Sequence, residues 1–478
     1  MWSQVTLPLW VVTILALLTT LALLDRLLIP SVRWALRRRA NKAIDELNTR
    51  LKLQIQPFKL TKRQVLIDQL VYDPEVLHAV EVYSKEHGVP REVAIAKVKR
   101  YAREIVPAFS AYAYFRIGTA LARRLSQLLY RVRIGIRNEE AFAAVDPASS
   151  VVFVINHRSN MDYVLVTYVA ASSSALSYAV GEWAQIWGLS SLIRSMGAYF
   201  IRRDSRDALY RKVLARYVHM ATSAGVVQAI FPEGGLSRDG KLRPPKFGLL
   251  SYMIASFDPF GARDVIFIPV GINYDRVLED RMLTSAAAIE PGQKPVFGFS
   301  ARTFFRHFFR HLWMAVRGEW YRFGYTCVSF GEPISLRKYV MEKKIDFRTL
   351  APDPRYAEIE KFGNKLMEAV GRVVPALPVS LVSTAMLEAG DRLLTLIEIK
   401  ERVSHLIGEF ETSGVYVHIP RADRDYAIEV GLRMLTLRHL VLEEDGNYRA
   451  NPKELVLLRY YANAIAHLLT NRTKQLAA

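Results

Sequence analysis

The chain has 478 residues, 51% of them hydrophobic, and a formal net charge of +19. Its length is too great for one ordinary domain and predicts two or three, with ample apolar content for their cores. The positive excess attracts anions, which leaves nucleic acid, acidic lipid headgroups and phosphorylated small molecules open as partners. A single cysteine, Cys327, excludes an intramolecular disulfide and a cysteine-rich zinc site and favours a reducing compartment.

An uncharged stretch from Leu7 to Leu24 is long enough to cross most of a bilayer as a helix. It predicts one transmembrane anchor. A removed signal peptide is a weaker alternative because no basic segment precedes the stretch and no small-residue cleavage site follows it. Another alternative is a buried helix of a soluble domain. The basic residues that follow place the body of the chain on the cytoplasmic side of the cell (inner) membrane. They are Arg26, Arg33, Arg37, Arg38, Arg39 and Lys42.

Changes in residue pattern divide the rest of the chain. Residues 1–40 form the anchor and its basic flank, and the helical spacing of apolar residues over 41–137 predicts a helical N-terminal domain. Short β-rich runs then alternate with helical stretches, which predicts an α/β domain over residues 138–374. Helical spacing returns after Pro375, so residues 375–478 are expected to form a small, mainly helical C-terminal domain. Functional groups of the α/β domain should lie at strand ends.

The stretch VVFVINHRSNMD, residues 151–162, places a histidine and an aspartate at the end of an apolar run. His157 and Asp162 would lie about 140° apart on one helix, so they can meet only across a turn. If a strand ends near Ile155 and a helix begins near Ser159, Asp162 accepts a hydrogen bond from one imidazole nitrogen and the other nitrogen can take a proton from a bound hydroxyl. We predict that His157 is a general base oriented by Asp162. The alternative is a helix-capping or core histidine.

Two further blocks follow predicted strands. Arg202 and Arg203 come directly after an apolar strand, where guanidinium groups can make forked contacts with phosphate oxygens. The next block, residues 231–248, has an acid and two glycines that let the backbone approach a ligand, followed by several cations. These residues are Glu233, Gly234 and Gly235, then Arg238, Lys241, Arg243 and Lys246. The pattern predicts a phosphate-binding loop; the alternatives are a solvated arginine pair and a flexible basic surface loop.

Four blocks occur in order along the chain: HRSNMD at 157–162, GAYFIRR at 197–203, FPEGGLS at 231–237 and IPV at 268–270. They resemble the four motifs of the glycerolipid acyltransferases. More narrowly, the first three blocks resemble those of the membrane-bound glycerol-3-phosphate 1-O-acyltransferases, and so does the tail, with PVSLVSTA at 378–385 and LRYYAN at 458–463. The resemblance covers residues 75–478. One departure is Leu236, which stands where the family usually has arginine.

The resemblance implies a mixed sheet flanked by helices and the transfer of an acyl chain from acyl-CoA or acyl carrier protein to the sn-1 hydroxyl of glycerol 3-phosphate. The product would be lysophosphatidate, for phospholipid synthesis. By motif position His157 is the base and Asp162 its orienting partner. The glycerol-phosphate site would be lined by Arg203, Glu233, Gly234, Ser237 and Arg238. No metal or redox cofactor is expected, and membrane lipids are expected partners.

Two other functions fit the same residues. Within the acyltransferases, the acceptor could be lysophosphatidate or another lysolipid. From a different class, the chain could be a membrane-tethered lipid-binding protein, for which the His157/Asp162 pair would be dispensable. No nucleic-acid-binding module or base-stacking motif accompanies the positive charge, so nucleic acid is not expected as a partner.

Overall fold

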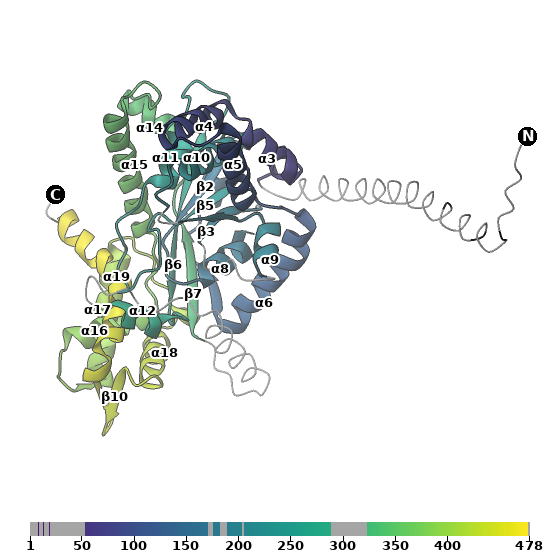
Figure 1. Cartoon of the computed structure of the whole chain (residues 1–478). Coiled ribbons are helices and arrows are strands. Elements are labelled where there is room, and N and C mark those ends of the chain that lie inside the picture. The colour runs from purple at the N-terminus through teal and green to yellow at the C-terminus, as the bar shows by residue number, and fades with distance from the viewer. Residues whose placement is uncertain are drawn as a thin grey trace, which may run out of the picture. The chain divides into compact units, whose positions relative to one another are not determined.

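The computed structural model describes residues 53–170, 175–181, 189–202, 205–287 and 323–476 and, nearer the N-terminus, only Pro8, Thr13 and Thr19. Residues Ile55–Ala478 form one compact unit (Figure 1). The predicted anchor over residues 7–24 lies outside the described residues. Among the helices that are described, none is long and apolar enough to cross a membrane.

The compact unit is built on an eight-stranded mixed sheet with the strand order β1-β7-β6-β2-β5-β3-β4, and β8 also pairs with β6. Neighbouring strands from β6 to β4 run parallel, β7 and β8 run antiparallel to β6, and β1 runs parallel to β7. The strands are β1 (Arg131–Ile134), β2 (Ser150–Ile155), β3 (Ser177–Gly181), β4 (Tyr199–Ile201), β5 (Gln228–Ile230), β6 (Val265–Tyr274), β7 (Tyr325–Phe330) and β8 (Ile334–Ser335). The predicted mixed α/β architecture is therefore confirmed.

Central strands form where the sequence has runs of β-branched residues. β2 reads SVVFVI and β6 reads VIFIPVGINY, and every residue of both strands is buried. Such runs are typical of strands that are covered on both faces, and β2 and β6 lie next to each other at the centre of the sheet.

One hydrophobic core joins β2 and β6 to the apolar sides of a group of helices, which gather around the upper part of the sheet in Figure 1. These helices are α3 (Arg63–Val71), α4 (Pro74–His87), α5 (Arg91–Ile105), α10 (Ala208–Ser223), α11 (Gly248–Ile254), α14 (Leu336–Lys343) and α15 (Pro352–Arg372). The N-terminal helices thus share a core with the sheet. The region predicted to be helical also contributes β1 to the sheet.

A second group of helices includes α6 (Thr119–Leu129), which packs on α8 (Met161–Ala170). The π-helix η1 (Ala113–Gly118) leads into α6 and contacts α9 (Leu189–Ser195). Among the described residues before position 288, the remaining helices are α2 (Pro57–Leu60), α7 (Glu139–Ala143) and α12 (Asp280–Ala287).

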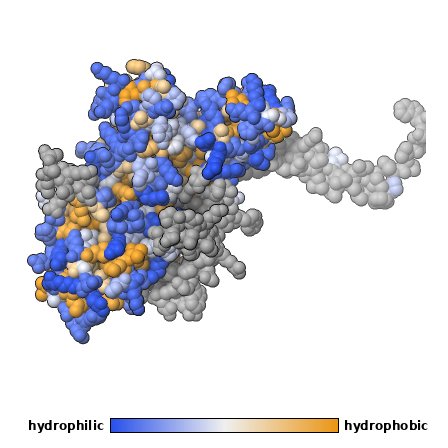
Figure 2. Space-filling view, turned by 60° about the vertical axis from the view of Figure 1, so that its left-hand side comes forward, coloured by the Kyte–Doolittle hydropathy of each residue, from blue (hydrophilic) through white to orange (hydrophobic). Residues whose placement is uncertain are grey.

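Residues from 378 onward form a mainly helical region around α16 (Pro378–Glu388), which contacts α17 (Leu396–Thr412), α18 (Arg424–Thr436) and α19 (Leu455–Leu476). A three-stranded antiparallel sheet lies beside them, with the order β10 (Val441–Glu444), β11 (Asn447–Ala450) and β9 (Leu394–Thr395). The short 3-10 helices η3 (Pro420–Ala422) and η4 (Pro452–Glu454) complete the region. On the face seen in Figure 2, hydrophilic side chains cover most of the described surface, with apolar ones in small groups between them.

Candidate active site

The site begins where β2 ends. Asn156 follows the strand, and its side chain continues the hydrogen bonds between β2 and β6. The side-chain amide donates to the carbonyl of Ile272 at 2.9 Å and accepts from the backbone N–H of the same residue at 2.7 Å. His157 comes next, in the turn before α8. The turn is therefore fixed against the neighbouring strand.

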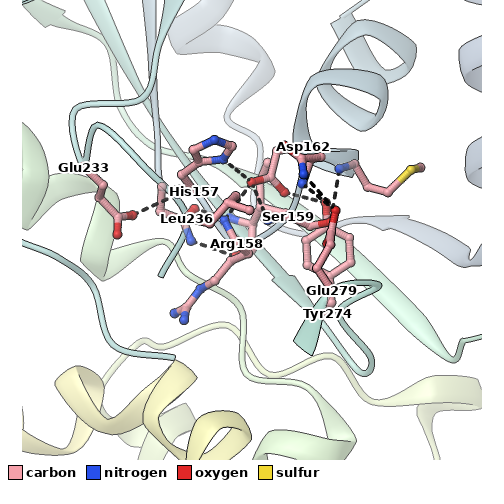
Figure 3. A network of polar contacts seen from close by, with 12 residues as sticks. His157, Arg158, Ser159, Asp162, Glu233, Leu236, Tyr274 and Glu279 are labelled. Carbon is pink, nitrogen blue, oxygen red and sulfur yellow. Dashed lines mark hydrogen bonds and ion pairs between the residues drawn. The ribbon is translucent and has the colours of Figure 1, made fainter. Parts of the chain in front are cut away.

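His157 and Asp162 meet across this turn, as their spacing predicted (Figure 3). The imidazole Nδ1 lies 2.9 Å from Asp162 Oδ2, and the two side chains are 1% and 0% exposed. Oδ2 also accepts the backbone N–H groups of Arg158 at 2.7 Å and Ser159 at 3.0 Å. A carboxylate held in this way keeps the proton of the ring on Nδ1 and supports positive charge on the imidazole.

The other ring nitrogen of His157, Nε2, is buried and has no hydrogen-bond partner within the described residues. The imidazole packs against Tyr163 edge-on, with centroids 5.3 Å apart, and against Phe231 at 4.4 Å. His157 also lines a cavity of about 210 Å³, together with Tyr163 and Phe231. A buried imidazole nitrogen without a partner can accept a proton from a hydroxyl bound in this cavity.

Glu233, predicted to contact a ligand, links the loop after β5 to the turn that holds His157. Its Oε1 accepts the backbone N–H of His157 at 2.8 Å and its Oε2 accepts that of Arg243 at 3.0 Å. Burial raises the pKa of its carboxyl, opposed by the nearby charge of Arg158 and by these backbone N–H groups. The backbone N–H of Ser237 donates to the carbonyl of His157 at 3.1 Å, and its hydroxyl donates to that of Lys241 at 2.7 Å.

The predicted glycines have different surroundings. Gly234 lines the cavity and has φ +66°, and a Cβ there would lie 2.7 Å from Cδ of Lys246. Glycine thus lets the backbone and the lysine stem lie side by side. Gly235 is buried and is not among the residues that line the cavity.

The predicted cations separate into two groups. Arg202 and Lys246 line the cavity. Arg238 and Lys241 are exposed and are not among its lining residues. The Arg202 guanidinium is already bound to the Glu104 carboxylate by two hydrogen bonds, of 2.8 and 2.6 Å. Arg203 lies outside the described residues.

Residues that the sequence reading missed also belong to the site. Arg211, in the first turn of α10, lines the cavity. A cation in the first turn of a helix interacts unfavourably with the helix dipole. This unusual position was a signal in the sequence for a residue with a functional role. Tyr274 and Glu279 follow the IPV block and contact the His157–Asp162 segment: the Tyr274 hydroxyl donates to Asp162 Oδ1 at 2.6 Å, and Glu279 Oε2 accepts from the Ser159 hydroxyl at 2.7 Å.

Tyr163 also lines a second cavity, of about 330 Å³. Its walls are almost entirely apolar. They include Leu121 and Leu125 of α6, Val164 of α8 and Ile193 of α9. The arrangement therefore places a cavity lined by cations and a nearly apolar cavity next to one tyrosine beside the turn that holds His157.

Comparisons with known proteins agree with this arrangement. A family model described as "Acyltransferase" matches residues 133–273, and one described as "Glycerol-3-phosphate acyltransferase C-terminal region" matches residues 310–473. A glycerol-3-phosphate acyltransferase of Pseudomonas fluorescens (strain SBW25) is 31% identical over 340 residues, which are 69% of this chain and 38% of the relative. One of Alteromonas mediterranea is 27% identical over 429 residues, 86% of this chain and 50% of the relative.

A solved structure, the 1-acyl-sn-glycerophosphate (LPA) acyltransferase of Thermotoga maritima, is 17% identical and covers 63% of this chain and 98% of its own, with a TM-score of 0.29. That score is too low to compare the two folds.

The region from β1 to β6, with its histidine turn and the first family match, is an acyltransferase domain. With the second match and the two relatives, the chain is similar to glycerol-3-phosphate acyltransferases over most of its length. It spans between 38% and 50% of the length of these curated relatives.

Proposed function

We propose that the protein transfers a fatty acyl chain from acyl-CoA or acyl carrier protein to the sn-1 hydroxyl of glycerol 3-phosphate, giving lysophosphatidate. The observation that carries this proposal is His157, whose Nδ1 is bound to Asp162 and whose buried Nε2 has no described partner beside a cavity with cationic residues. The relatives are named for the same substrate.

The proposed reaction is a direct transfer. Nε2 of His157 removes the proton of the sn-1 hydroxyl as its oxygen attacks the thioester carbonyl carbon, and the carbonyl π electrons move onto oxygen. The tetrahedral intermediate collapses, the C–S bond breaks, and the thiolate leaves and takes the proton from His157. The Asp162 carboxylate stabilises the imidazolium that exists between these steps.

Two described cations of the cavity are available for the acceptor phosphate. Within the part of the chain that the structure describes, the Arg211 guanidinium makes no ion pair or side-chain hydrogen bond, and the Lys246 side chain reaches over Gly234. Arg202 is held by Glu104, so it shapes the cavity wall more than it offers free donors. Arg203 is proposed as a further phosphate contact from its motif position. Forked guanidinium contacts and a lysine charge suit a phosphate dianion.

The apolar cavity beside Tyr163 suits the acyl chain of the donor, because burial of hydrocarbon there is favourable at about 25 cal/mol per Å². The chain would then reach the turn that holds His157 past Tyr163, which lines both cavities. The thioester carbonyl would lie between the two cavities, close to His157.

The reaction as proposed needs no metal or redox cofactor. We also propose that the anchor over residues 7–24 holds the protein in the cell (inner) membrane, with the catalytic domain on the cytoplasmic side, because basic residues follow the apolar stretch. Protease treatment of sealed inner-membrane vesicles of known orientation tests the topology.

The activity is tested with the membrane-bound full chain, labelled acyl-CoA or acyl carrier protein, and glycerol 3-phosphate or lysophosphatidate offered separately. We expect labelled lysophosphatidate from the first acceptor, and a loss in kcat of about 10²- to 10⁴-fold in His157→Ala. Acylation of lysophosphatidate alone would identify a lysolipid acyltransferase. Donor or lipid binding without turnover, unchanged in His157→Ala, would identify a lipid-binding protein.

A further inference from the structure

Two buried residues near the end of β6 contact the catalytic turn without facing the cavity that His157 lines. Tyr274 is the last residue of the strand and Glu279 follows five positions later; they are 1% and 6% exposed. Both lie beyond residues 133–273, which the acyltransferase model matches.

Strand register brings them to the site. β2 and β6 pair in parallel up to Ile155 and Val270, so β6 continues past the end of β2. The Asn156 side chain replaces the missing strand by bonding both backbone groups of Ile272. The last residues of β6 therefore run directly beside the turn that holds His157.

Tyr274 completes the hydrogen bonds of the Asp162 carboxylate. Oδ2 accepts the His157 ring nitrogen and two backbone N–H groups, and Oδ1 accepts the Tyr274 hydroxyl at 2.6 Å. That length is typical of a hydroxyl bound to an ionised carboxylate. The tyrosine ring packs against Tyr130, with centroids 5.2 Å apart, so the donor cannot turn away easily.

Glu279 holds the turn itself. Its Oε2 accepts the Ser159 hydroxyl at 2.7 Å, and its Oε1 accepts the backbone N–H and the side-chain amide of Asn160 at 3.2 and 3.1 Å. Figure 3 shows Glu279 and Tyr274 on the same side of Asp162, opposite Glu233. Since the backbone N–H of Ser159 is a donor to Asp162, fixing this residue also fixes the carboxylate.

We propose that Tyr274 and Glu279 are positioning residues for acyl transfer: Tyr274 orients the Asp162 carboxylate, and Glu279 holds the turn whose backbone N–H groups bind the same carboxylate. The inference rests on the proposed role of His157 as the base. Neither residue lines the cavity beside His157, and Glu279 is also among the residues that line the apolar cavity. Both carboxylate oxygens of Glu279 are bound to Ser159 and Asn160, so its contact with the site runs through the turn.

The test must separate this role from a general loss of packing. The titratable groups around Asp162 are His157, Tyr274 and Glu279. Tyr130 packs against Tyr274, Glu233 accepts the backbone N–H of His157, and the charge of Arg158 lowers the pKa of Glu233. Tyr130 offers a matched control. It is also buried at 1% exposure, and its hydroxyl donates to the carbonyl of Arg276 at 2.9 Å rather than to Asp162.

The experiment compares full-length Tyr274→Phe and Tyr130→Phe in kcat, in KM for glycerol 3-phosphate, and in the pH profile of kcat/KM. With one donor fewer, Asp162 holds the imidazole proton more strongly. In Tyr274→Phe we expect the acidic limb to move to higher pH by about half a unit to one unit, and kcat to fall about tenfold while KM stays within about twofold. Tyr130→Phe should leave the limb in place. Equal profiles in the two variants would overturn the role of Tyr274.

A second measurement does not depend on activity. The pH titration of the His157 ring can be followed by ¹⁵N NMR, with the signals assigned by their loss in His157→Gln. The midpoint of this titration should move to higher pH in Tyr274→Phe and stay at its wild-type pH in Tyr130→Phe. If wild type shows no transfer to glycerol 3-phosphate, the proposed function fails, yet this titration still decides the role of Tyr274. An unchanged titration would overturn it.

Glu279 is tested with Glu279→Gln and Glu279→Ala. Glutamine can still accept from Asn160 and donate to the Ser159 hydroxyl, so kcat should stay within about threefold of wild type. Alanine releases the turn, and kcat should fall about tenfold with little change in KM. Equal kcat values in wild type and Glu279→Ala would rule out the positioning role.

Discussion

At the scale of single residues, the site depends on which buried polar groups are satisfied within the protein and which are left for a ligand. Asp162 is satisfied at both oxygens, and Glu233 is satisfied by two backbone N–H groups. Nε2 of His157 has no described partner. A buried polar atom of this kind costs free energy in the empty protein, which is usual where a substrate supplies the missing hydrogen bond.

The first prediction concerns Arg211, which the sequence reading did not select. Arg211→Gln should raise KM for glycerol 3-phosphate about tenfold, because a charged hydrogen bond to phosphate contributes about 1.5–3 kcal/mol, and kcat should change little. The neighbouring Lys212→Gln is the control: Lys212 is paired with Glu75 at 2.7 Å and does not line the cavity. Steady-state kinetics of both variants check this, and equal KM values would exclude Arg211 from the phosphate site.

The second prediction concerns the pH dependence of stability. Burial raises the pKa of Glu279 from 4.5 to about 7, with Asp162 adding to the rise and the Ser159 and Asn160 donors opposing it. Between these values the folded state keeps a proton that the unfolded state has lost. The bound proton of Glu279 therefore contributes fully to stability below the unfolded pKa, and this contribution is lost as pH rises through the folded pKa. The free energy of unfolding falls by no more than about 1.4 kcal/mol per pH unit in this range.

Glu279→Gln lacks this titration. Urea unfolding from pH 5 to 8 should show wild type losing stability relative to the variant as pH rises. The buried Asp275, whose pKa is also raised to about 7 by burial, is present in both proteins and cancels in the comparison. A constant difference across this range would contradict a raised pKa of Glu279.

These residues also show how far sequence reasoning reaches. The strand, turn and helix around His157 follow from a β-branched run and capping residues, and the contact with Asp162 follows from their spacing. The sequence did not show that both oxygens of Glu233 accept backbone N–H groups, and its contact with the substrate stays a prediction. Tyr274 was missed because its contact with Asp162 depends on the register between β2 and β6, which apolar periodicity does not specify.

At the scale of elements, the loop after β5 is held between the turn at His157 and α19. Arg158, 2% exposed, donates through one guanidinium nitrogen to the carbonyl of Gly240 and through another to that of Ala464 at 3.1 Å. The Asn463 amide donates to the carbonyl of Asp239 at 2.8 Å. The C-terminal helix thus fixes the tip of the loop whose base carries Glu233 and Gly234.

Gly240 gives a prediction for this contact. It has φ +85°, and a Cβ there would collide with the backbone carbonyl oxygen of Tyr460 in α19. Gly240→Ala should therefore cost more than the 1–2 kcal/mol of left-handed strain, roughly 3 kcal/mol or more, because loop and helix must separate. Gly390→Ala is the control, with φ +63° and open space around the Cβ position. Urea unfolding should show a much smaller loss for Gly390→Ala; similar losses would mean that the loop moves freely away from α19.

At the scale of the whole molecule, the C-terminal region is joined to the acyltransferase domain by buried polar contacts next to β6. Asn273 donates from its amide to the carbonyl of Pro375 at 2.9 Å, and Asp275 accepts the backbone N–H of Val379 at 3.1 Å. The sequence patterns predicted a domain boundary between residues 374 and 375. Asn273 and Asp275 lie before this boundary and hydrogen-bond to Pro375 and Val379 after it. Folding of the site and folding of the C-terminal region should therefore be coupled.

Arg438 tests that coupling. Its guanidinium lies 2.6 Å from the Asp280 carboxylate, and the side chains are 10% and 6% exposed. The Tyr461 hydroxyl also donates to this carboxylate. Arg438→Met leaves the buried Asp280 charge without its cation and should lower the free energy of unfolding by about 3–5 kcal/mol. The control variant Arg424→Met removes an exposed ion pair between Arg424 and Glu411, whose side chains are 47% and 43% exposed, and should cost about 1 kcal/mol or less.

If the two regions fold together, Arg438→Met should shift one cooperative urea transition and lower glycerol 3-phosphate acylation in parallel. Two separate transitions, with activity following only the later one, would show that the acyltransferase domain folds without its C-terminal partner.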